Sequence, residues 1–480
     1  MPESIFSTIA KLTIHRRKIK REEELRVMRS SMVEELSTVH QKQLAAYESE
    51  LSEKARIIQE HLERIRELKI QQDGDYFLTS LLTRPMIADR NQSELVQTHV
   101  FVEQKKKFEF RKWKSDLGGD TCITDQVTLR GKKYTVFLNG DAMGKSLQGA
   151  GGAIVLGVIV HTYLNRSKFS SYQMQKSPEL WLRDAALDIQ NAFLAFDGSM
   201  FVSVVMGIVE EMTGAMYYFN AEHPWIVLLR NGKARFLEQV KIHTFRLQPG
   251  DVLLMGSDGR DDLEIGREGD VRIINEDEQK FRQIVEDACG DVSLIVERLR
   301  DAGEITDDLS LLRLSYREDL RPAATPREYF TKVKQAVALV RAGKLTEASR
   351  MLTMLTKEYP DESLARGYLG RLQFKEKQFT DAIENLSACF EANPEDSTML
   401  YLLARALKQS GKFAEAIDFG ERLLLREPGH IQNLINLADA HRLNGNVDRA
   451  RNVINRVLTL SPESAQAKRL AEMLPMRAAY

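Results

Sequence analysis

The last third of this 480-residue chain repeats one pattern of residues with a fixed period. One proline and two small residues recur every 34 positions, four times each: Pro360, Pro394, Pro428 and Pro462; Ala348, Ala382, Ala416 and Ala450; Ala336, Gly370, Ala404 and Ala438. Small residues let two helices approach closely, and a proline ends the second helix before the next unit begins. The period therefore predicts four pairs of antiparallel helices.

This pattern resembles the tetratricopeptide repeat over about Glu328–Ser464, and the apolar-faced segment Ala465–Leu474 is expected to form a capping helix. Two positions depart from the family: Lys377 replaces a glycine found in the other three repeats, and Gly420 replaces a leucine or isoleucine. The resemblance implies a concave groove that binds an unidentified protein or peptide. The alternative is that the array only packs on another domain of its own chain or dimerises.

Length and charge exclude several classes of protein. A chain of 480 residues is longer than one hydrophobic core usually serves, so about three domains are expected. The 68 Lys and Arg residues balance the 69 Asp and Glu residues, which argues against a nucleic-acid partner because such proteins carry a basic excess. The three cysteines lie too far apart for a CxxC pair or a disulfide framework, and this is typical of a reducing compartment.

The sequence predicts neither export nor a membrane span. The basic cluster His15–Arg21 follows apolar residues, which is the reverse of a signal peptide. A membrane-surface anchor is the alternative for this cluster, but Glu22–Glu24 follow at once and favour a solvated helix. The longest apolar run, Gly149–Leu164, is rich in glycine and shorter than the ~20 residues that span a bilayer. We therefore predict that this run is a buried helix and that the protein is cytoplasmic, with no transmembrane segment.

Residues 21–72 contain no proline or glycine, and apolar residues recur there with heptad spacing. The clearest part of this seam is Leu51, Ala55, Ile58, Leu62 and Ile65. Such a seam predicts a long helix that forms a homodimeric coiled coil. The alternative is a single solvated helix packed on its own domain. Asp73-Gly74 is expected to end the helix.

From about Tyr76 to Tyr316 the sequence changes to short alternating apolar runs joined by turns. Asn231-Gly232 between two such runs is the strongest short signal for a β-hairpin. Three helical patterns interrupt the strands: Ser146–Asn165, Pro178–Phe196 and Glu278–Arg300. This arrangement predicts antiparallel sheets covered by helices rather than alternating β–α–β units.

Four segments of this region place aspartates at strand ends, beside glycine or another aspartate. They are Gly118-Gly119-Asp120, Gly140-Asp141, Ser257-Asp258-Gly259 and Asp307-Asp308. Any one of them alone is an ordinary turn. Together they offer the oxygen ligands that Mg²⁺ and Mn²⁺ prefer, and the glycines let backbone oxygens come close. The sequence therefore predicts a site for hard cations.

The order of the motifs along the chain is also informative. The motifs are Gly118–Asp120, Gly140–Lys145, Asn220–Pro224, Leu247–Asp251, Ser257–Gly259 and Asp307–Leu312. In this order they resemble the SpoIIE/RsbU group of metal-dependent serine/threonine protein phosphatases, of the PPM superfamily, over about Gln71–Ser315. The resemblance implies an α+β domain built as an α-β-β-α sandwich of antiparallel sheets.

The resemblance also implies which residues bind metal. Asp141 would bridge two Mn²⁺ or Mg²⁺ ions, and the backbone carbonyl of Ala142 would add one ligand. Asp308 would lie outside the metal shells or act as a weaker ligand, and Lys145 would either contact phosphate near the site or cap the loop. Three further carboxylates would complete those shells, directly or through water: Asp120, Asp258 and Asp307.

The implied reaction is in-line attack of a hydroxide held by both ions on a phosphoserine or phosphothreonine ester, and it needs no side-chain nucleophile. His223 belongs to a structural turn of the family and is not expected to act as a general acid. Glu222 and Ser146 stand where the family usually has glycine. Ser146 is expected to cap the helix that follows it.

These interpretations divide the chain into five parts: an N-terminal helix or coiled coil (1–72), a linker helix that switches activity (73–94), a SpoIIE-type phosphatase domain (95–316), a linker (317–327) and an all-α array of four tetratricopeptide repeats plus a capping helix (328–480). We expect this multidomain protein to dephosphorylate a signalling partner, which the family resemblance identifies as a STAS-domain anti-anti-sigma factor. Strain passed from the coiled coil through Asp73–Pro85 is expected to control assembly of the metal site. The alternative function is a non-catalytic repeat scaffold with a degenerate phosphatase fold. The presence of all four proposed metal-binding aspartates argues against this alternative.

Overall fold

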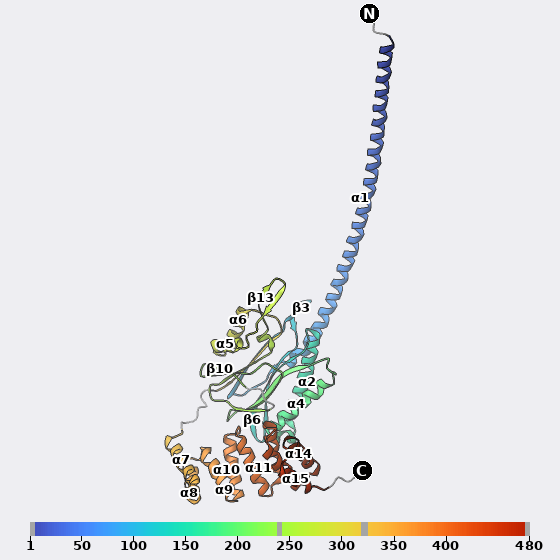
Figure 1. Ribbon diagram of the computed structural model, residues 1–480. Helices are drawn as coiled ribbons and strands as arrows, with labels where there is room; N and C mark the ends of the chain where they lie inside the picture. The colour runs from blue at the N-terminus through green and yellow to red at the C-terminus, as the bar shows by residue number, and fades with distance from the viewer. Residues whose placement is uncertain (1–4, 238–241, 318–324, 476–480) are drawn as a thin grey trace. The chain divides into compact units, whose positions relative to one another are not determined.

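The structure is a computed structural model of the chain, and it describes residues 5–237, 242–317 and 325–475 (Figure 1). Met1–Asp75 and Tyr76–Tyr480 form two units, and each is described by itself. Residues 318–324 of the predicted linker 317–327 lie outside the described residues.

One helix, α1 (Ile5–Thr83), makes up the first unit and continues into the second. The prediction that Asp73-Gly74 ends this helix is wrong, because α1 passes through both residues. A glycine inside a helix costs about 1 kcal/mol relative to alanine. Burial of the next turn offsets that cost, since Tyr76 is 4% exposed and packs with Phe108 and Ala150. Residues of the predicted seam are exposed on the first unit: Leu51, Ile58, Leu62 and Ile65.

Two sheets form the centre of the second unit. The first has six strands in the order β1 (Ala88–Asp89), β5 (Asp120–Leu129), β6 (Lys132–Ala142), β7 (Val202–Glu210), β8 (Ala215–Ala221) and β11 (His243–Arg246). The second has five in the order β10 (Lys233–Phe236), β9 (Val227–Arg230), β12 (Val252–Gly256), β16 (Leu309–Tyr316) and β2 (Val96–Glu103). All neighbours in these sheets are antiparallel except β1 and β5. Smaller elements are the pair β3 (Lys106–Phe110) and β4 (Trp113–Leu117), and the sheet β14 (Val271–Ile274), β13 (Leu263–Glu268) and β15 (Glu304–Ile305).

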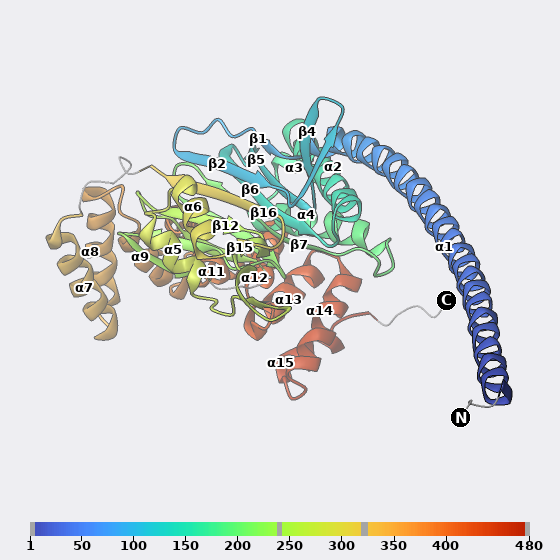
Figure 2. The same ribbon diagram turned by 90° about the horizontal axis from the view of Figure 1, so that it is seen from above.

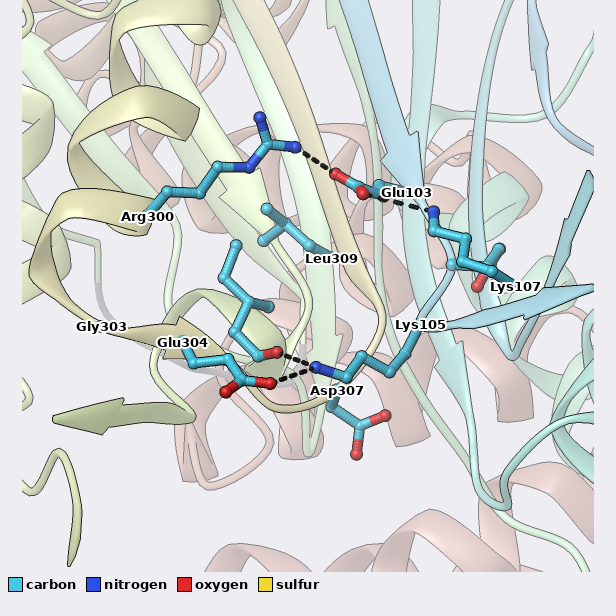
Figure 3. A pocket seen from close by; sticks show the side chains of 10 residues that line it. Glu103, Lys105, Lys107, Arg300, Gly303, Glu304, Asp307 and Leu309 are labelled. Carbon is cyan, nitrogen blue, oxygen red and sulfur yellow. Dashed lines mark hydrogen bonds and ion pairs between the residues drawn. The ribbon is translucent and has the colours of Figure 1, made fainter. Parts of the chain in front are cut away.

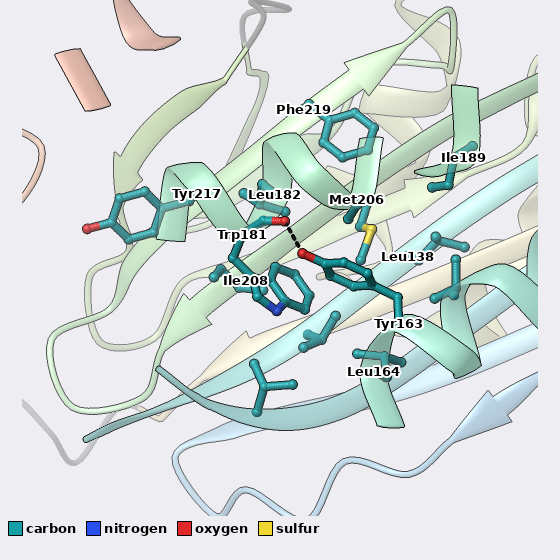
Figure 4. Close-up of a cluster of buried hydrophobic side chains, with 14 of the residues drawn as sticks. Leu138, Tyr163, Leu164, Trp181, Leu182, Ile189, Met206, Ile208, Tyr217 and Phe219 are labelled. Carbon is teal, nitrogen blue, oxygen red and sulfur yellow. Dashed lines mark hydrogen bonds between the residues drawn. The ribbon is translucent and has the colours of Figure 1, made fainter. Parts of the chain in front are cut away.

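Helices cover the outer face of each sheet (Figures 1 and 2). The helices α2 (Leu147–Phe169) and α4 (Pro178–Leu194) pack on the six-stranded sheet around Leu156, Trp181 and Met206 (Figure 4). The helices α5 (Lys280–Asp287) and α6 (Val292–Ala302) pack on the other sheet. A third core, which includes Phe137 and Leu253, fills the space between the sheets. The predicted α-β-β-α sandwich is confirmed. The remaining short helices are η1 (Arg84–Met86), α3 (Ser171–Met174) and η2 (Asp258–Arg260).

Helix α2 contains the apolar run Gly149–Leu164, which was predicted to be a buried helix. Both Leu156 and Leu164 are 0% exposed. Among the described residues α2 is also the one helix with the length and hydropathy of a membrane span, and half of that apolar window is buried inside the protein. Helix α2 is therefore rich in apolar residues because it covers the six-stranded sheet.

The single helical pattern predicted over Glu278–Arg300 forms two helices, α5 and α6. The chain turns between them at Cys289 and Gly290, whose φ angles are 50° and 73°, a left-handed conformation that ends a right-handed helix. Asp291 then caps α6 by accepting a hydrogen bond from the backbone N–H of Leu294 at 3.0 Å. The periodicity of the sequence did not reveal this turn.

The repeats form the helical pairs that the 34-residue period predicts. The pairs are α7 (Arg327–Arg341) with α8 (Leu345–Glu358), α9 (Ser363–Lys375) with α10 (Phe379–Ala392), α11 (Ser397–Gln409) with α12 (Phe413–Arg426), and α13 (Ile431–Leu443) with α14 (Val447–Leu460). The capping helix is α15 (Ala465–Glu472). The small residues lie at the contacts between helices, since Ala348, Ala382, Ala416 and Ala450 are all 0% exposed.

Three residues that replace a family glycine keep a left-handed backbone. The φ angles are 63° at Lys377, 54° at Glu222 and 58° at Ser146, whereas Gly411, the counterpart of Lys377 in the next repeat, has φ 80°. Ser146 occupies the N-cap position of α2, as expected, but its side chain forms no capping hydrogen bond. These three positions thus keep the positive φ angle that glycine favours, although none of them is a glycine.

Candidate active site

Both sheets carry aspartates at strand ends. Strand β5 begins at Asp120 and β6 ends at Asp141-Ala142, and the β5–β6 ladder sets Asp120 opposite Asp141. In the other sheet, Asp258 follows β12 and Asp307 precedes β16. Because β12 and β16 are antiparallel neighbours, the end of β12 lies beside the start of β16. Hairpin and sheet pairing therefore bring together residues that are far apart in the sequence.

The pKa values of these carboxyl groups reflect their proximity. Burial, followed by the charge of Asp258, raises the pKa of Asp141 to about 7. Burial, followed by the charges of Asp262 and Asp307, raises the pKa of Asp258 to about 6. Burial, followed by the charge of Asp141, raises the pKa of Asp120 well above its ordinary value. Charge repulsion therefore connects the four predicted aspartates in series: Asp120 with Asp141, Asp141 with Asp258 and Asp307, and Asp258 with Asp307.

One oxygen of the Asp120 carboxylate is buried without a hydrogen-bond partner. The Ser257 hydroxyl donates a hydrogen bond to Asp120 Oδ2 at 2.6 Å, and Asp120 is 1% exposed. Among the described residues, no group donates a hydrogen bond to Asp120 Oδ1. A buried acceptor left unsatisfied costs about 1–3 kcal/mol, and more when it is charged. A bound cation would remove this cost.

The backbone of Gly119, beside Asp120, passes close to the backbone of Ala142, whose carbonyl is a predicted metal ligand. The Ala142 N–H donates a hydrogen bond to the Gly119 carbonyl at 3.2 Å, and a Cβ atom on Gly119 would lie 2.3 Å from the Ala142 carbonyl oxygen. Glycine is therefore required at this position. Within the described residues no three His, Cys, Asp or Glu side chains converge closely enough to hold one metal ion. A metal site here would thus also need the Ala142 carbonyl and water.

Asp308 binds backbone groups on both sides of the site. Its Oδ1 accepts a hydrogen bond from the Lys105 N–H at 2.6 Å, and its Oδ2 accepts one from the Gly119 N–H at 2.8 Å. A Cβ atom on Gly118 would lie 2.1 Å from Asp308 Oδ2, which explains the first glycine of the Gly118-Gly119-Asp120 motif. Asp308 therefore holds the turn that carries Asp120.

Three further residues belong to the site but were not predicted, while the predicted Lys145 is exposed. The Lys145 charge opposes the burial and the neighbouring carboxylates that raise the pKa of Asp262. Asp262 follows Asp258 by four residues in the same acidic segment, and this spacing could have identified it. Ser257 belongs to the motif Ser257-Asp258-Gly259, in which only Asp258 was predicted to be a site residue. Gln104, whose Nε2 donates to the Asp120 carbonyl at 2.9 Å, has no signal in the sequence.

His223 takes part in a buried hydrogen-bond network, in line with its predicted structural role. Its Nε2 lies 2.6 Å from Asn139 Oδ1 and its Nδ1 lies 2.8 Å from Ser203 Oγ. Because an amide oxygen only accepts, Nε2 carries the proton and the Ser203 hydroxyl donates to Nδ1. Burial, followed by the charge of Arg260, lowers the pKa of His223 to about 3. The ring is therefore neutral, with both nitrogens engaged.

A cavity of about 410 Å³ borders Asp307 (Figure 3). Its walls carry three ion pairs: Lys105 Nζ lies 3.3 Å from Glu304, Arg300 lies 2.5 Å from Glu103, and Lys107 Nζ lies 3.2 Å from Glu103. All five side chains are between 36% and 66% exposed. The cavity is therefore a polar, solvent-accessible recess beside the carboxylate cluster.

Comparison with known proteins identifies two kinds of domain. A model of the stage II sporulation protein E (SpoIIE) family matches residues 131–317, which include Asp141, Asp258 and Asp307 but not Asp120. Two tetratricopeptide-repeat models match residues 333–388, and residues 373–434 and 409–474. The search of curated proteins found no match.

Several solved structures are similar to parts of the chain. The RsbU and RsbW domains of a Mycobacterium tuberculosis protein are 18% identical, with 57% of this chain and 78% of that chain covered and a TM-score of 0.35. The SiaA-PP2C domain of Pseudomonas aeruginosa is 15% identical, with 52% and 97% covered and a TM-score of 0.39. MamA from Desulfovibrio magneticus RS-1 is 20% identical, with 28% and 77% covered and a TM-score of 0.27. The sheet-rich domain therefore matches the SpoIIE family model over residues 131–317, and the C-terminal helices match tetratricopeptide-repeat models.

Proposed function

We propose that the chain is an active metal-dependent protein serine/threonine phosphatase. The observation that carries this proposal is the buried, unpartnered Oδ1 of Asp120 within a cluster of carboxyl groups that raise one another's pKa values. Two divalent ions, Mn²⁺ or Mg²⁺, would neutralise this charge, lower the pKa of a coordinated water and polarise the phosphoryl oxygens. The proposed ligands are Asp120, Asp141, Asp258, Asp307 and the backbone carbonyl of Ala142.

The chain's own residues position these ligands. Ser257 holds Oδ2 of Asp120, so that Oδ1 is left for the ligand site. Asp308 fixes the backbone of the adjacent turn at Gly119. His223 does not donate a proton to the substrate, because its ring is neutral and both nitrogens are engaged.

The proposed substrate is a phosphoserine or phosphothreonine on a signalling partner, a STAS-domain anti-anti-sigma factor. The match to the SpoIIE family supports this assignment. We also propose that the repeat array binds a protein or peptide and that the protein acts in the cytoplasm. Homodimerisation through α1 is supported by the exposure of its heptad residues, such as Leu51 and Ile58, which are 67% and 58% exposed.

The test uses the full-length protein and a phosphorylated STAS-domain protein. We expect Mn²⁺-dependent release of phosphate, loss of activity in EDTA, and a rate at least about 10²-fold lower for Asp141→Asn. The matched control is Asp188→Asn, an exposed carboxylate on α4, which should leave the rate unchanged. Equal activity in Asp141→Asn would refute the mechanism. Binding of the phosphoprotein without turnover would instead support the scaffold.

A further inference from the structure

Three buried charges join the repeat array to the phosphatase domain. Glu179, in the first turn of α4, is 0% exposed, and Arg422 and Arg426 on α12 are 5% and 8% exposed. Arg422 Nε donates a hydrogen bond to Glu179 Oε2 at 3.0 Å, and Arg426 Nε donates one to Oε1 at 3.0 Å. Arg426 Nη2 also donates to Oε1. We call these three residues the buried triad.

Aromatic and apolar groups surround the triad. The guanidinium of Arg426 lies 5.6 Å from the ring centre of Tyr217 on β8, and that of Arg422 lies 4.8 Å from Phe390 in the array. Leu425 of α12 packs against the core that α4 shares with the six-stranded sheet. This part of the array therefore packs against the phosphatase domain. Such packing is one of the alternatives given for the repeats in the sequence analysis.

The triad keeps its charges inside this apolar contact. Burial raises the pKa of Glu179, but the charges of Arg422 and Arg426 outweigh it and lower the pKa to about 2. Removing one partner of a buried pair strongly destabilises the contact, because the remaining charge is left without compensation. Replacing all members by apolar residues of similar volume is often tolerated. The contact thus depends on a matched set of side chains.

Helix α4 is coupled in turn to α2. The Tyr163 hydroxyl of α2 donates a hydrogen bond to the Trp181 carbonyl at 2.7 Å (Figure 4). Trp181 Nε1 donates one to Ser167 Oγ at 2.8 Å, and the rings of Tyr163 and Trp181 lie 5.0 Å apart. Trp181 stands two residues after Glu179, so both contacts involve the same turn of α4.

The first turns of α2 touch two of the segments that carry candidate metal ligands, those of Asp120 and of Asp141-Ala142. A Cβ atom on Gly149 would lie 2.2 Å from the Gly144 carbonyl oxygen and 3.1 Å from Gly119. A Cβ atom on Gly152 would lie 2.5 Å from the side chain of Ala142. A small displacement of α2 would therefore move the backbone on both sides of Asp120 and Asp141.

We propose that the repeat array is an allosteric input to the active site, acting through the buried triad, α4 and α2. The array is a fixed part of the phosphatase domain rather than a tethered module. A partner that binds the array and shifts α12 changes the position of α2, and hence the geometry of the segments that carry Asp120 and Asp141. The effect on catalysis rests on the proposed function, whereas the mechanical coupling does not.

Hydrogen exchange of the full-length protein tests the coupling without requiring activity. In Arg422→Met/Arg426→Met, which leaves Glu179 buried without its partners, we expect amide exchange at residues 141–153 to be about tenfold faster than in the wild type. The triple variant with Glu179→Leu added should restore wild-type exchange by making the contact apolar. The control is Arg130→Gln, which removes an ion pair to Asp418 at the partly exposed rim of the contact and should change exchange little.

The outcomes separate coupling from simple docking. Faster exchange in α12 with wild-type exchange at residues 141–153 would overturn the proposal, because the array would then have loosened without effect on the site. If the double variant does not fold, the single variant Glu179→Gln replaces it, with the same expected direction. Where wild-type phosphatase activity is measurable, kcat/KM should change about fivefold or more in the double variant and return in the triple variant. If the wild type is inactive, the proposed function fails while the exchange result still decides the coupling.

Discussion

The carboxylate cluster should make the metal-free protein less stable as the pH rises. The pKa of Asp141 is raised from 3.8 to about 7, and at about 1.4 kcal/mol per pKa unit this corresponds to about 4 kcal/mol. A carboxyl group whose pKa is higher in the folded than in the unfolded state contributes its full stabilisation at pH values below its unfolded-state pKa. This contribution is lost as the pH rises through its folded-state pKa. The loss therefore extends from about pH 4 to pH 7, and the wild type in EDTA should be less stable at pH 8 than at pH 5.

Asp141→Asn removes this repulsion and should stabilise the metal-free protein. At pH 8 in EDTA we expect the free energy of unfolding to rise by about 2–4 kcal/mol and Tm to rise by about 5–10 °C, with a smaller difference at pH 5. Asp188→Asn, whose carboxylate is 44% exposed on α4, is the control and should shift Tm by less than about 1 °C. Thermal unfolding followed by circular dichroism measures both variants.

Adding Mn²⁺ should reverse the order of the two proteins. The ion binds the folded wild type and raises its Tm with concentration, whereas Asp141→Asn lacks a proposed ligand and should respond weakly. A variant that is no more stable than the wild type in EDTA at pH 8 would refute the reasoning, because the carboxyl groups would then not repel one another in the folded state.

Three further predictions concern other parts of the chain. Ser257→Ala removes the hydrogen bond to the buried Asp120 carboxylate and should cost about 1–3 kcal/mol in urea unfolding; an unchanged midpoint would contradict the role given to Ser257. Lys377→Gly relieves a left-handed φ of 63° and should stabilise the protein by about 1 kcal/mol, whereas Gly411→Lys should have the opposite effect. Leu62→Glu places a charge in the exposed seam of α1 and should convert a dimer to a monomer in analytical ultracentrifugation; a wild type that is already monomeric would exclude the coiled coil.

The sequence predicted the candidate site because its residues are tied to strand ends. Asp120 and Asp141 flank one hairpin, so pairing of β5 with β6 is enough to set them opposite each other. Asp258 and Asp307 flank antiparallel neighbours in the same way. Gln104 could not be predicted, since its contact with Asp120 depends on how the β2–β3 connection packs against the start of β5, which no local pattern encodes.

Helix ends were harder to predict than helices. The periodicity of α1 weakens at Asp73-Gly74, but burial of Tyr76 continues the helix. The periodicity of residues 278–300 continues through Cys289-Gly290, although the backbone there is left-handed. In both cases tertiary packing or a local turn outweighs propensity, whose contribution is only about 1 kcal/mol at a glycine.

The contact between the array and the phosphatase domain had no sequence signal at all. Glu179 and Arg422 are 243 residues apart, and each alone is an ordinary charge on a helix. Buried ion pairs of this kind are recognised only when the fold brings them together and removes water. The 34-residue period predicted the fold of the array, but it gave no information on which face is covered.

Helix α2 packs against the linker segment at Met86 and against α4, which in turn contacts the array. On one side, Met86 lies against Gly157, where a Cβ atom would be 2.6 Å from its side chain, and the Met86 carbonyl lies 3.2 Å from His161 Nε2. Elsewhere on the same helix, Tyr163 binds Trp181. Perturbations that share one packed element are not additive. A signal from the N-terminal helix and a signal from the array therefore cannot be independent at the active site: releasing α2 from α4 should also weaken the response to any change passed through Met86.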